Sequence, residues 1–324
     1  MSAKVGQKVA VVGAGASACF FSYLLRDTDH EISIFEKSRG IGGRCSVRRT
    51  EEFGSFNLGA QFFTNKNPKL RDYFEEIKAR GMIKELPGDV GYLKQKSEWQ
   101  AANKQQRFVG IPSMNSFLKY WAAEAEIKLN MRIKSISKTD NKWCIETEKG
   151  EVYEGFDTCV LSVPHPQGLA FWQDHSDIKV PETKMFPCLA LILATDEISL
   201  PWPNAFLKDS MLSWYGSKNR LDQVRTWTVH ASPIWSEAHF DADSEWTQEQ
   251  MINELFSLLK VNPKVHFSQM HRWRYASSQS SADHNFLWDS HNRLAYIGDW
   301  LAGGRVEGAM ESAASLATIL SQDA

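Results

Sequence analysis

The sequence predicts an α/β fold in which a Rossmann-like domain with a parallel sheet and a β-meander is joined to a second domain. The second domain is expected to be α+β, with a largely antiparallel sheet. Three observations predict this. Residues 8–36 read as strand, glycine turn, helix and strand. Strand-like runs recur between residues 189 and 275 around one long helical pattern. A further strand and helix follow from residue 294.

The first part of the chain is expected to alternate strands and helices around glycine-rich turns. Residues 8–12 are a β-branched run that suits a strand buried on both faces. The helix at 68–80 carries a proline in its first turn, and Ser113 is the expected N-cap of the helix at 113–125. The expected elements in order are a strand at 8–12, a helix at 19–26, a strand at 31–35, a helix at 68–80, short antiparallel strands within 86–109 and a helix at 113–125.

The middle of the chain predicts a β-meander followed by one more buried strand. Residues 127–136 and 143–147 flank the turn signal Asp140-Asn141, and Lys149-Gly150 turns the chain into residues 151–153. The apolar strand at 158–163 is expected to stop at the prolines that follow, Pro164 and Pro166.

The second half predicts the antiparallel sheet and the return to the first domain. The expected elements are strands at 189–194, 204–208, 211–216, 226–231 and 266–275, a helix at 247–259, a serine-rich connector at 277–282, a strand at 294–297 and a helix at 307–320. We therefore expect a discontinuous cofactor-binding domain (1–64, 110–170 and 285–324) and a substrate domain (65–109 and 171–284).

Composition excludes several classes. Of the 324 residues 43% are apolar, which is enough for a large core and excludes general disorder. The net charge of −2 argues against sequence-independent nucleic-acid binding, which depends on excess positive charge. No nucleic-acid partner is expected.

Five widely spaced cysteines form no C-x-x-C pair, so neither a disulfide framework nor a zinc site is expected. Residues 9–25 carry no charge, but Gly13 and Gly15 interrupt them and they are short for a membrane span. We expect a cytoplasmic protein with no membrane attachment and no metal.

The first turn has the pattern G-x-G-x-x-A of a dinucleotide-binding loop. Gly13 permits the tight turn, Gly15 allows the backbone to approach a pyrophosphate, and Ala18 lets the helix pack closely on the strand. Glu36 ends the second strand, where a carboxylate accepts hydrogen bonds from ribose hydroxyls. The alternative is a glycine turn in another kind of α/β protein, and the pattern alone does not separate NAD from FAD.

A second glycine loop, Gly42-Gly43-Arg44, follows the acidic residue. Such a loop can wrap a larger dinucleotide, and the planar guanidinium of Arg44 can pair with phosphate. The alternative interpretation is a solvated loop arginine.

These residues resemble the flavin-containing amine oxidase superfamily, and within it the renalases, especially the bacterial ones. Further segments carry the resemblance in the same order along nearly the whole chain. They are Leu58-Gly-Ala-Gln-Phe-Phe-Thr64 (with Asn57 where the family has Asp), His271-Arg-Trp-Arg-Tyr-Ala276, Gly298-Asp-Trp300 and Gly304-Arg-Val-Glu-Gly-Ala309.

The resemblance implies a two-domain flavoprotein with noncovalent FAD. It implies oxidation of 2-dihydro and 6-dihydro isomers of NAD(P)H by the flavin, with dioxygen reduced to hydrogen peroxide. The flavin itself is expected to be the catalytic group, and no catalytic side chain is expected. The expected FAD-binding residues are Gly13, Gly15, Ala16, Ser17, Ala18, Glu36, Lys37, Gly43, Arg44, Ala60, Gln61, Phe62, Ile133, Gly298, Asp299, Arg305, Val306 and Glu307.

An aromatic strand supplies candidates for the substrate pocket. If residues 271–276 are extended, His271, Trp273 and Tyr275 share one face. Gln61 and Phe63 project alike from their own segment, and Trp214 and His230 lie on other expected strands. The alternative is that these side chains are ordinary core of the second domain.

Two other functions stay open. A flavin-containing amine oxidase needs a pocket for a neutral amine, often between two facing aromatic rings. A flavin- or nucleotide-binding protein without turnover is the other alternative. For an oxidase, the expected partners are a small-molecule substrate and dioxygen.

Overall fold

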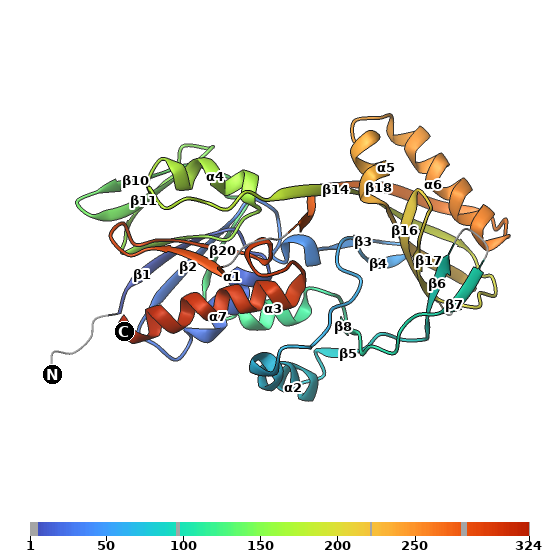
Figure 1. Cartoon of the computed structure of the whole chain (residues 1–324), viewed down its shortest axis with the longest axis horizontal. Coiled ribbons are helices and arrows are strands. Elements are labelled where there is room, and N and C mark those ends of the chain that lie inside the picture. The colour runs from blue at the N-terminus through green and yellow to red at the C-terminus, as the bar shows by residue number, and fades with distance from the viewer. Residues whose placement is uncertain (1–5, 95–97, 221, 280–283, 324) are drawn as a thin grey trace.

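The computed structural model describes residues 6–94, 98–220, 222–279 and 284–323. The chain forms two lobes that lie side by side along the longest axis of the molecule (Figure 1). The first lobe is built on a six-stranded sheet and the second on a seven-stranded sheet. Two long strands, β14 (Lys184–Asp196) and β18 (Val265–Gln279), run between the lobes.

The sheet of the first lobe has the strand order β19-β20-β13-β1-β2-β9. Its strands are β1 (Lys8–Val12), β2 (Glu31–Glu36), β9 (Glu126–Leu129), β13 (Thr158–Leu161), β19 (Phe286–Asp289) and β20 (Leu294–Ile297). Neighbours from β20 to β9 are parallel, and β19 pairs antiparallel at the edge. This confirms the predicted Rossmann-like sheet. In sheets of this kind, ligands bind beyond the carboxyl ends of the central strands. Because β1 is a central strand, the loop that follows it is where a ligand is expected.

Both faces of this sheet are covered. The covering elements are α1 (Ala16–Leu24), α3 (Ser116–Trp121), α4 (His165–Gln173), α7 (Arg305–Asp323), β10 (Ile133–Thr139), β11 (Lys142–Thr147) and β12 (Val152–Phe156). Val9 and Val11 of β1 pack in the cluster of α1, α3 and α7, whereas Ala10 and Val12 pack with the meander and α4. All four are at most 5% exposed, as a strand buried on both faces requires.

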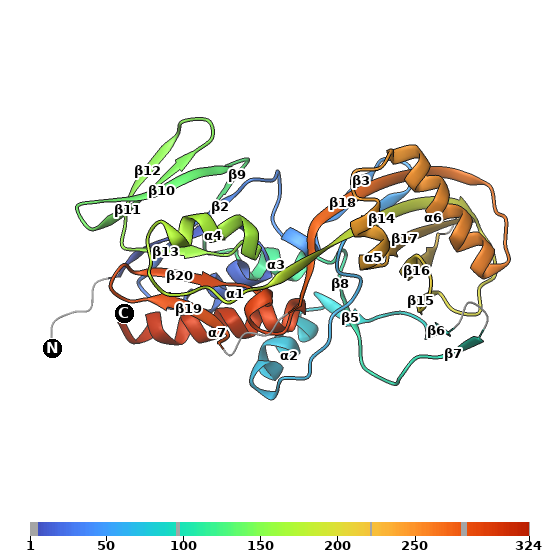
Figure 2. The same cartoon turned by 45° about the horizontal axis from the view of Figure 1, so that its top comes forward.

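The sheet of the second lobe has the order β18-β14-β17-β16-β15-β6-β7 and is antiparallel except between β15 and β6. Its other strands are β6 (Val90–Lys94), β7 (Glu98–Ala101), β15 (Asn204–Leu207), β16 (Leu212–Asn219) and β17 (Val224–Ala231). The helices α5 (Pro233–Ala238) and α6 (Ser244–Leu259) lie over one face of it (Figure 2). Leu191 and Val229 of the sheet pack there with Met251 of α6.

The remaining elements are short. They are the 3-10 turns at Gly43–Cys45, Pro68–Leu70 and Asp299–Leu301, the strands β3 (Val47–Thr50), β4 (Gly54–Asn57), β5 (Ile83–Glu85) and β8 (Phe108–Gly110), and the helix α2 (Arg71–Ala79). Phe53 and Phe56 of the β3–β4 hairpin pack against Ile192, on the sheet face away from α6. Phe74 and Ile77 of α2 belong to the core of the first lobe.

Two expected elements are shorter or divided. The helix expected at 113–125 covers only Ser116–Trp121, and its N-cap is Asn115 rather than Ser113. The Ser113 hydroxyl instead donates to Asn115 Oδ1 (3.0 Å). The run expected as one strand at 127–136 breaks at Asn130, whose φ of 60° turns the chain from the parallel sheet into the meander.

Two further differences concern helix α4 and the serine-rich stretch. Pro166 does not merely end a strand, because it lies in the first turn of α4, where a missing N–H costs little. The stretch expected as a connector at 277–282 continues β18 as far as Gln279, and its residues 280–282 lie outside the described residues.

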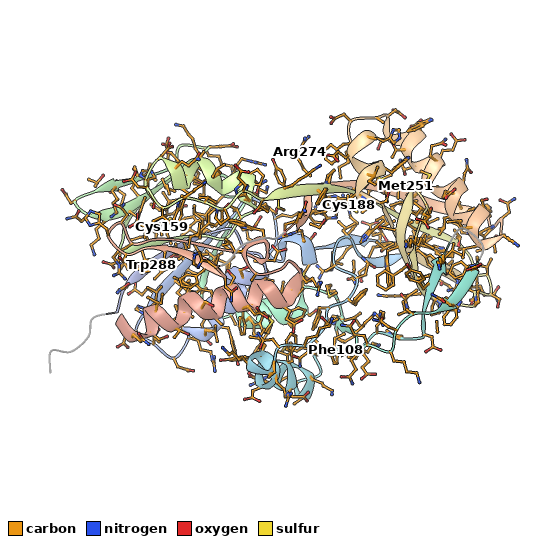
Figure 3. The ribbon with its side chains drawn as sticks, viewed as in Figure 1. Phe108, Cys159, Cys188, Met251, Arg274 and Trp288 are labelled. Atoms are coloured by element: carbon orange, nitrogen blue, oxygen red, sulfur yellow. The ribbon has the colours of Figure 1, made fainter. Side chains whose placement is uncertain are left out.

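All five cysteines are free. Burial raises the pKa of the Cys159 and Cys188 thiols to about 12, so both are poor nucleophiles at neutral pH. Cys159 lies in the first lobe and Cys188 on β14 (Figure 3). Across the described ranges, no three histidine, cysteine or acidic side chains gather as metal ligands. No helix in the same ranges is long and apolar enough to cross a membrane.

Candidate active site

The first glycine turn leaves β1 and enters α1 with the geometry that a dinucleotide loop needs. Gly13 has φ +98°, and a Cβ there would lie 2.5 Å from the carbonyl oxygen of Ser162. Gly15 is different, because a Cβ there would meet no atom within 4 Å. The open side of Gly15 borders the first turn of α1, whose amides have no partners within the helix. This turn therefore leaves room for an anion.

The end of β2 lies beside this turn. The carboxylate of Glu36 accepts hydrogen bonds from the amides of Ala14 (2.9 Å) and Ser38 (2.8 Å), and Glu36 is 6% exposed. Burial and then Arg132 lower the pKa of Lys37. Ile133, the first residue of β10, packs at the margin of the cluster under the meander. Of these three residues, Glu36 contacts the turn directly through the amide of Ala14.

The second glycine loop packs on the first. The amide of Gly42 donates to the carbonyl of Ala14 (2.8 Å). Gly43 has φ +50°, and a Cβ there would come within 3.3 Å of the Gly15 Cα. Two glycines thus face each other and keep the approach to the turn free of side chains. The open side of Gly15, beside the second loop, fits a pyrophosphate.

Arg44 and Asp299, which are 255 positions apart in the sequence, form an ion pair. The guanidinium donates to both carboxylate oxygens, with Nη1 at 2.9 Å from Oδ2, and Nη1 also lies 3.3 Å from the carbonyl oxygen of Ala276. The expected phosphate ligand and the expected ribityl ligand therefore pair with each other. The pair joins the second glycine loop to the Gly298-Asp299 turn and to the end of β18.

The start of α7 contacts this pair through its backbone. The amide of Gly304 donates to the carbonyl of Asp299 (2.7 Å), and Arg305 opens the helix. Val306 is buried in the core of the first lobe. The carboxylate of Glu307 accepts from the amide of Asn67 (2.5 Å) and from the Thr64 hydroxyl (3.2 Å). The side chains of Val306 and Glu307 are thus engaged in the protein, and only their backbone amides can serve a cofactor.

The segment from Leu58 to Thr64 wraps around Arg44. The amide of Ala60 donates to the Arg44 carbonyl (2.9 Å), and a Cβ on Gly59 would lie 2.1 Å from that oxygen. The side-chain amide of Gln61 donates to the carbonyls of Asn57 (2.6 Å) and Gly59 (3.0 Å). Because these two bonds use its nitrogen, Gln61 presents Oε1 toward the second lobe, close to Gly216.

A row of side chains crosses the second sheet opposite this segment. Residues directly opposite on paired strands share a face, and the row runs through Phe206, Trp214, His230, Ala190 and His271. His230 Nε2 lies 3.0 Å and Trp273 Nε1 3.4 Å from the carbonyl oxygen of Leu58. The structure therefore brings Gln61, Trp214, His230, His271 and Trp273 close to one another near Leu58. Their role in a substrate pocket stays a prediction.

Both histidines of the row are neutral at physiological pH. Burial lowers the pKa of His230, and burial together with Arg48 lowers the pKa of His271. A neutral imidazole donates from only one nitrogen, so His230 carries its proton on Nε2, toward Leu58. The two histidines thus add no charge to this aromatic row.

Phe63 does not join this face, and the prediction that it lines the substrate pocket is wrong. Its ring is 3% exposed and packs with those of Phe74, Phe108 and Phe117 in the first lobe. The neighbouring ring of Phe62, expected only at the cofactor, points toward the second sheet instead.

The Phe62 ring centroid lies 5.3 Å from Trp214 and 6.0 Å from Phe206. Phe206 and Arg107, which lies 5.4 Å from the Phe62 ring, escaped the sequence reasoning. Phe206 sits in an expected strand, but only the register shows its face. Tyr275 stays a prediction, because a bulge between Trp273 and Ser277 interrupts the alternation on which it rests.

Comparison with known proteins adds family membership. Residues 11–77 match the family described as NAD(P)-binding Rossmann-like domain, and residues 95–320 match the family described as Flavin containing amine oxidoreductase. Renalase from Mus musculus is 24% identical over 343 residues, which cover 97% of this chain and 98% of that protein. L-amino acid oxidase from Cerastes cerastes is 34% identical over 72 residues, or 22% of this chain and 14% of that protein.

Solved structures share the fold. A chain described as a protoporphyrinogen oxidase from Exiguobacterium sp. 255-15 aligns with a TM-score of 0.76 at 10% identity, covering 99% of this chain and 100% of that one. Wild-type putrescine oxidase bound to putrescine aligns with a TM-score of 0.68 at 12% identity, covering 98% and 99%. The chain is an FAD-dependent oxidoreductase and belongs to the family of flavin containing amine oxidoreductases.

Proposed function

We propose that the protein is a renalase-like oxidase. Its substrates are the 2-dihydro and 6-dihydro isomers of NAD(P)H, and its products are NAD(P)+ and hydrogen peroxide. The observation that carries the proposal is the match to renalase from Mus musculus, because it extends over 97% of the chain and so includes both lobes.

FAD, bound without a covalent link, would supply the acceptor for the substrate's hydride and the route of its two electrons to dioxygen. The turn at Gly13–Ala18, with Gly43 beside it, suits the pyrophosphate, and Glu36 suits the adenosine ribose. Asp299, fixed by Arg44, suits the ribityl chain. Further contacts are proposed from Lys37, Ala60, Gln61, Phe62, Ile133, Gly298 and the backbone at Arg305–Glu307.

The face of the second lobe would orient the substrate ring. A dihydronicotinamide loses hydride and becomes aromatic, so its oxidation needs no protein acid or base. The neutral His230 and His271 and the ring of Trp214 suit a planar uncharged group, and they exclude water from it. Gln61 Oε1 adds one fixed acceptor at the edge of this face.

The proposed domain boundaries follow the two sheets. The FAD-binding domain comprises residues 1–85, 108–170 and 285–324, and residues 86–107 and 171–284 form the substrate domain. These bounds shift the expected ones so that α2, β5 and β8 stay with the core they share. Five free thiols suit a reducing compartment, and we place the protein in the cytoplasm on that ground.

The competing function is oxidation of an amine, which the family description favours. The test is turnover of the FAD-loaded protein in air with borohydride-reduced NAD, which contains the dihydro isomers. We expect one NAD+ and one hydrogen peroxide for each isomer molecule consumed, with no turnover of ordinary NADH or of a panel of amines. Peroxide formed from an amine, and none from the isomers, would replace this function with amine oxidation.

A further inference from the structure

Arg107 is a buried cation beside the aromatic row. It is 9% exposed. Its terminal nitrogens donate to the carbonyls of Asn103 (Nη1, 3.4 Å) and Gln105 (Nη1, 3.1 Å) and to Asn103 Oδ1 (Nη2, 2.9 Å). Its Nε is buried without a partner. All three acceptors are neutral oxygens, and no carboxylate in the described ranges contributes to the electrostatics of Arg107.

Such a charge is costly to bury unless something compensates it. Burial lowers the pKa of Arg107, and no charged neighbour opposes that shift. Arg107 therefore keeps two unused N–H donors, one on Nε and one on Nη2. Two oxygens of a phosphate can accept from such a pair of guanidinium donors. The side chain is therefore held in place by its own loop while part of its donor set remains unused.

The position of Arg107 links it to the proposed ring site. The backbones of Phe63 and Phe108 exchange hydrogen bonds of 2.9 and 2.8 Å, which fixes Arg107 beside Phe62. The Arg107 guanidinium carbon lies 5.4 Å from the Phe62 ring and 5.7 Å from the Phe206 ring. Both rings pack on Trp214, at 5.3 and 4.7 Å. Arg107 is thus one aromatic layer away from the row that contains His230.

We propose that Arg107 binds the pyrophosphate of the dinucleotide substrate. The proposal rests on the proposed function, and it makes the phosphate group part of what the enzyme recognises. The site proposed above for the phosphates of FAD is the open side of Gly15 in the first lobe. Arg107 faces the rings of Phe62 and Phe206 at the second sheet, so it serves a different anion.

The kinetic test compares two substrates that carry the same reacting ring, borohydride-reduced NAD and borohydride-reduced nicotinamide riboside, which has no phosphate. In R107Q the KM for the NAD isomers should rise about tenfold or more, as expected for loss of a hydrogen bond to a charged group. The KM for the riboside isomers and both kcat values should stay within about twofold of wild type. In R107K, which keeps the charge without the fork, the KM should rise by less.

The matched control is R274Q. Arg274 is exposed on β18 and stacks on Phe240, so this variant removes the same charge at another point of the second lobe. Its KM values should equal those of wild type. FAD content and circular dichroism verify that each variant is folded. An equal change for both substrates in R107Q, or no change for either, would overturn the proposal.

An equilibrium measurement separates this proposal from the proposed function. Inorganic pyrophosphate is titrated by calorimetry into the FAD-loaded wild type, R107Q and R274Q. We expect binding to wild type and R274Q and at least about tenfold weaker binding to R107Q. If wild type oxidises neither isomer mixture, the proposed function fails and this titration alone decides whether Arg107 is a phosphate site. Equal affinity in all three proteins, or no binding to any, rejects it.

Discussion

Gly13 and Gly15 lie two positions apart in one turn, yet the structure constrains them differently. Gly13 combines a positive φ with a backbone oxygen 2.5 Å from where a Cβ would be. Gly15 faces open space and would tolerate a methyl group in the protein alone. Only the first glycine is therefore required by the fold, and the second is required by what binds there.

These two glycines give a paired prediction. G13A should lower the free energy of unfolding of the apoprotein by about 1–3 kcal/mol, because its backbone would be strained and crowded. G15A should leave that free energy within about 0.5 kcal/mol of wild type and still weaken FAD binding, since its methyl group occupies the approach of the pyrophosphate. Denaturant unfolding of the apoproteins and titration with FAD check both. Equal loss of stability in the two variants would contradict the assignment.

Phe62 and Phe63 show where sequence reasoning is weakest at this scale. Alternation predicts that neighbours point to opposite sides, and they do. It does not say which side is the core, and that is set by the bridge between Phe63 and Phe108. The sequence could therefore identify the segment but not the ring that reaches the second lobe. No local sequence pattern identifies Arg107, because what distinguishes it is its contact with the rings of Phe62 and Phe206, which are distant in the sequence.

At the scale of elements, one carboxylate joins three helices. Glu76 of α2 accepts hydrogen bonds from the hydroxyls of Tyr23 of α1 and Tyr120 of α3, the latter at 2.7 Å, and from Arg80 Nε at 3.1 Å. The hydrogen bond from Tyr23 is the largest cause that lowers the pKa of Glu76, whereas burial opposes it. Glu76 therefore fastens α2 to the first lobe.

Replacing Glu76 tests this joint. E76Q should lower the free energy of unfolding near pH 7 by about 1–3 kcal/mol, the range for hydrogen bonds to a charged group. Because the folded-state pKa is lowered from 4.5, this stabilisation is present above pH 4.5 and is lost as the pH falls through the lowered value. The wild type and E76Q should therefore converge in acid.

The control for that experiment is E75Q. Glu75 is an exposed neighbour whose one ion pair with the described residues is to Lys78 at 3.9 Å, so its removal should change stability by less than about 0.5 kcal/mol. A constant difference between wild type and E76Q from neutral to acid pH would show that the charge of Glu76 plays no part.

Elements encoded by local pattern were predictable. The strand, glycine turn, helix and second strand lie where periodicity and glycines place them. Helix α4 was missed because Pro166 was interpreted as the end of a strand, although proline is tolerated in a first helical turn. The single strand expected at 127–136 was wrong because three residues separate β9 from β10, and the first of them, Asn130, has a left-handed conformation that periodicity does not reveal.

At the scale of the whole molecule, the site exists only because distant segments meet. Arg44 contacts Asp299 and Ala276, and Leu58 contacts His230 and Trp273 of the second sheet. Long-range strand register and contacts between lobes are not encoded in any short window of sequence. The motifs could therefore indicate the cofactor, whereas the composition of the substrate face required the fold.

The central claim is that this two-lobed flavoprotein oxidises the isomeric dihydro forms of NAD(P)H. The most direct measurement mixes the FAD-loaded protein with borohydride-reduced NAD under anaerobic conditions in a stopped-flow instrument. The absorbance band of oxidised flavin is followed, with ordinary NADH and a panel of amines as controls. We expect rapid bleaching by the isomer mixture and none by the controls, followed by full recovery of the band when air is admitted. A band that persists with the isomers, or that an amine bleaches instead, would contradict it.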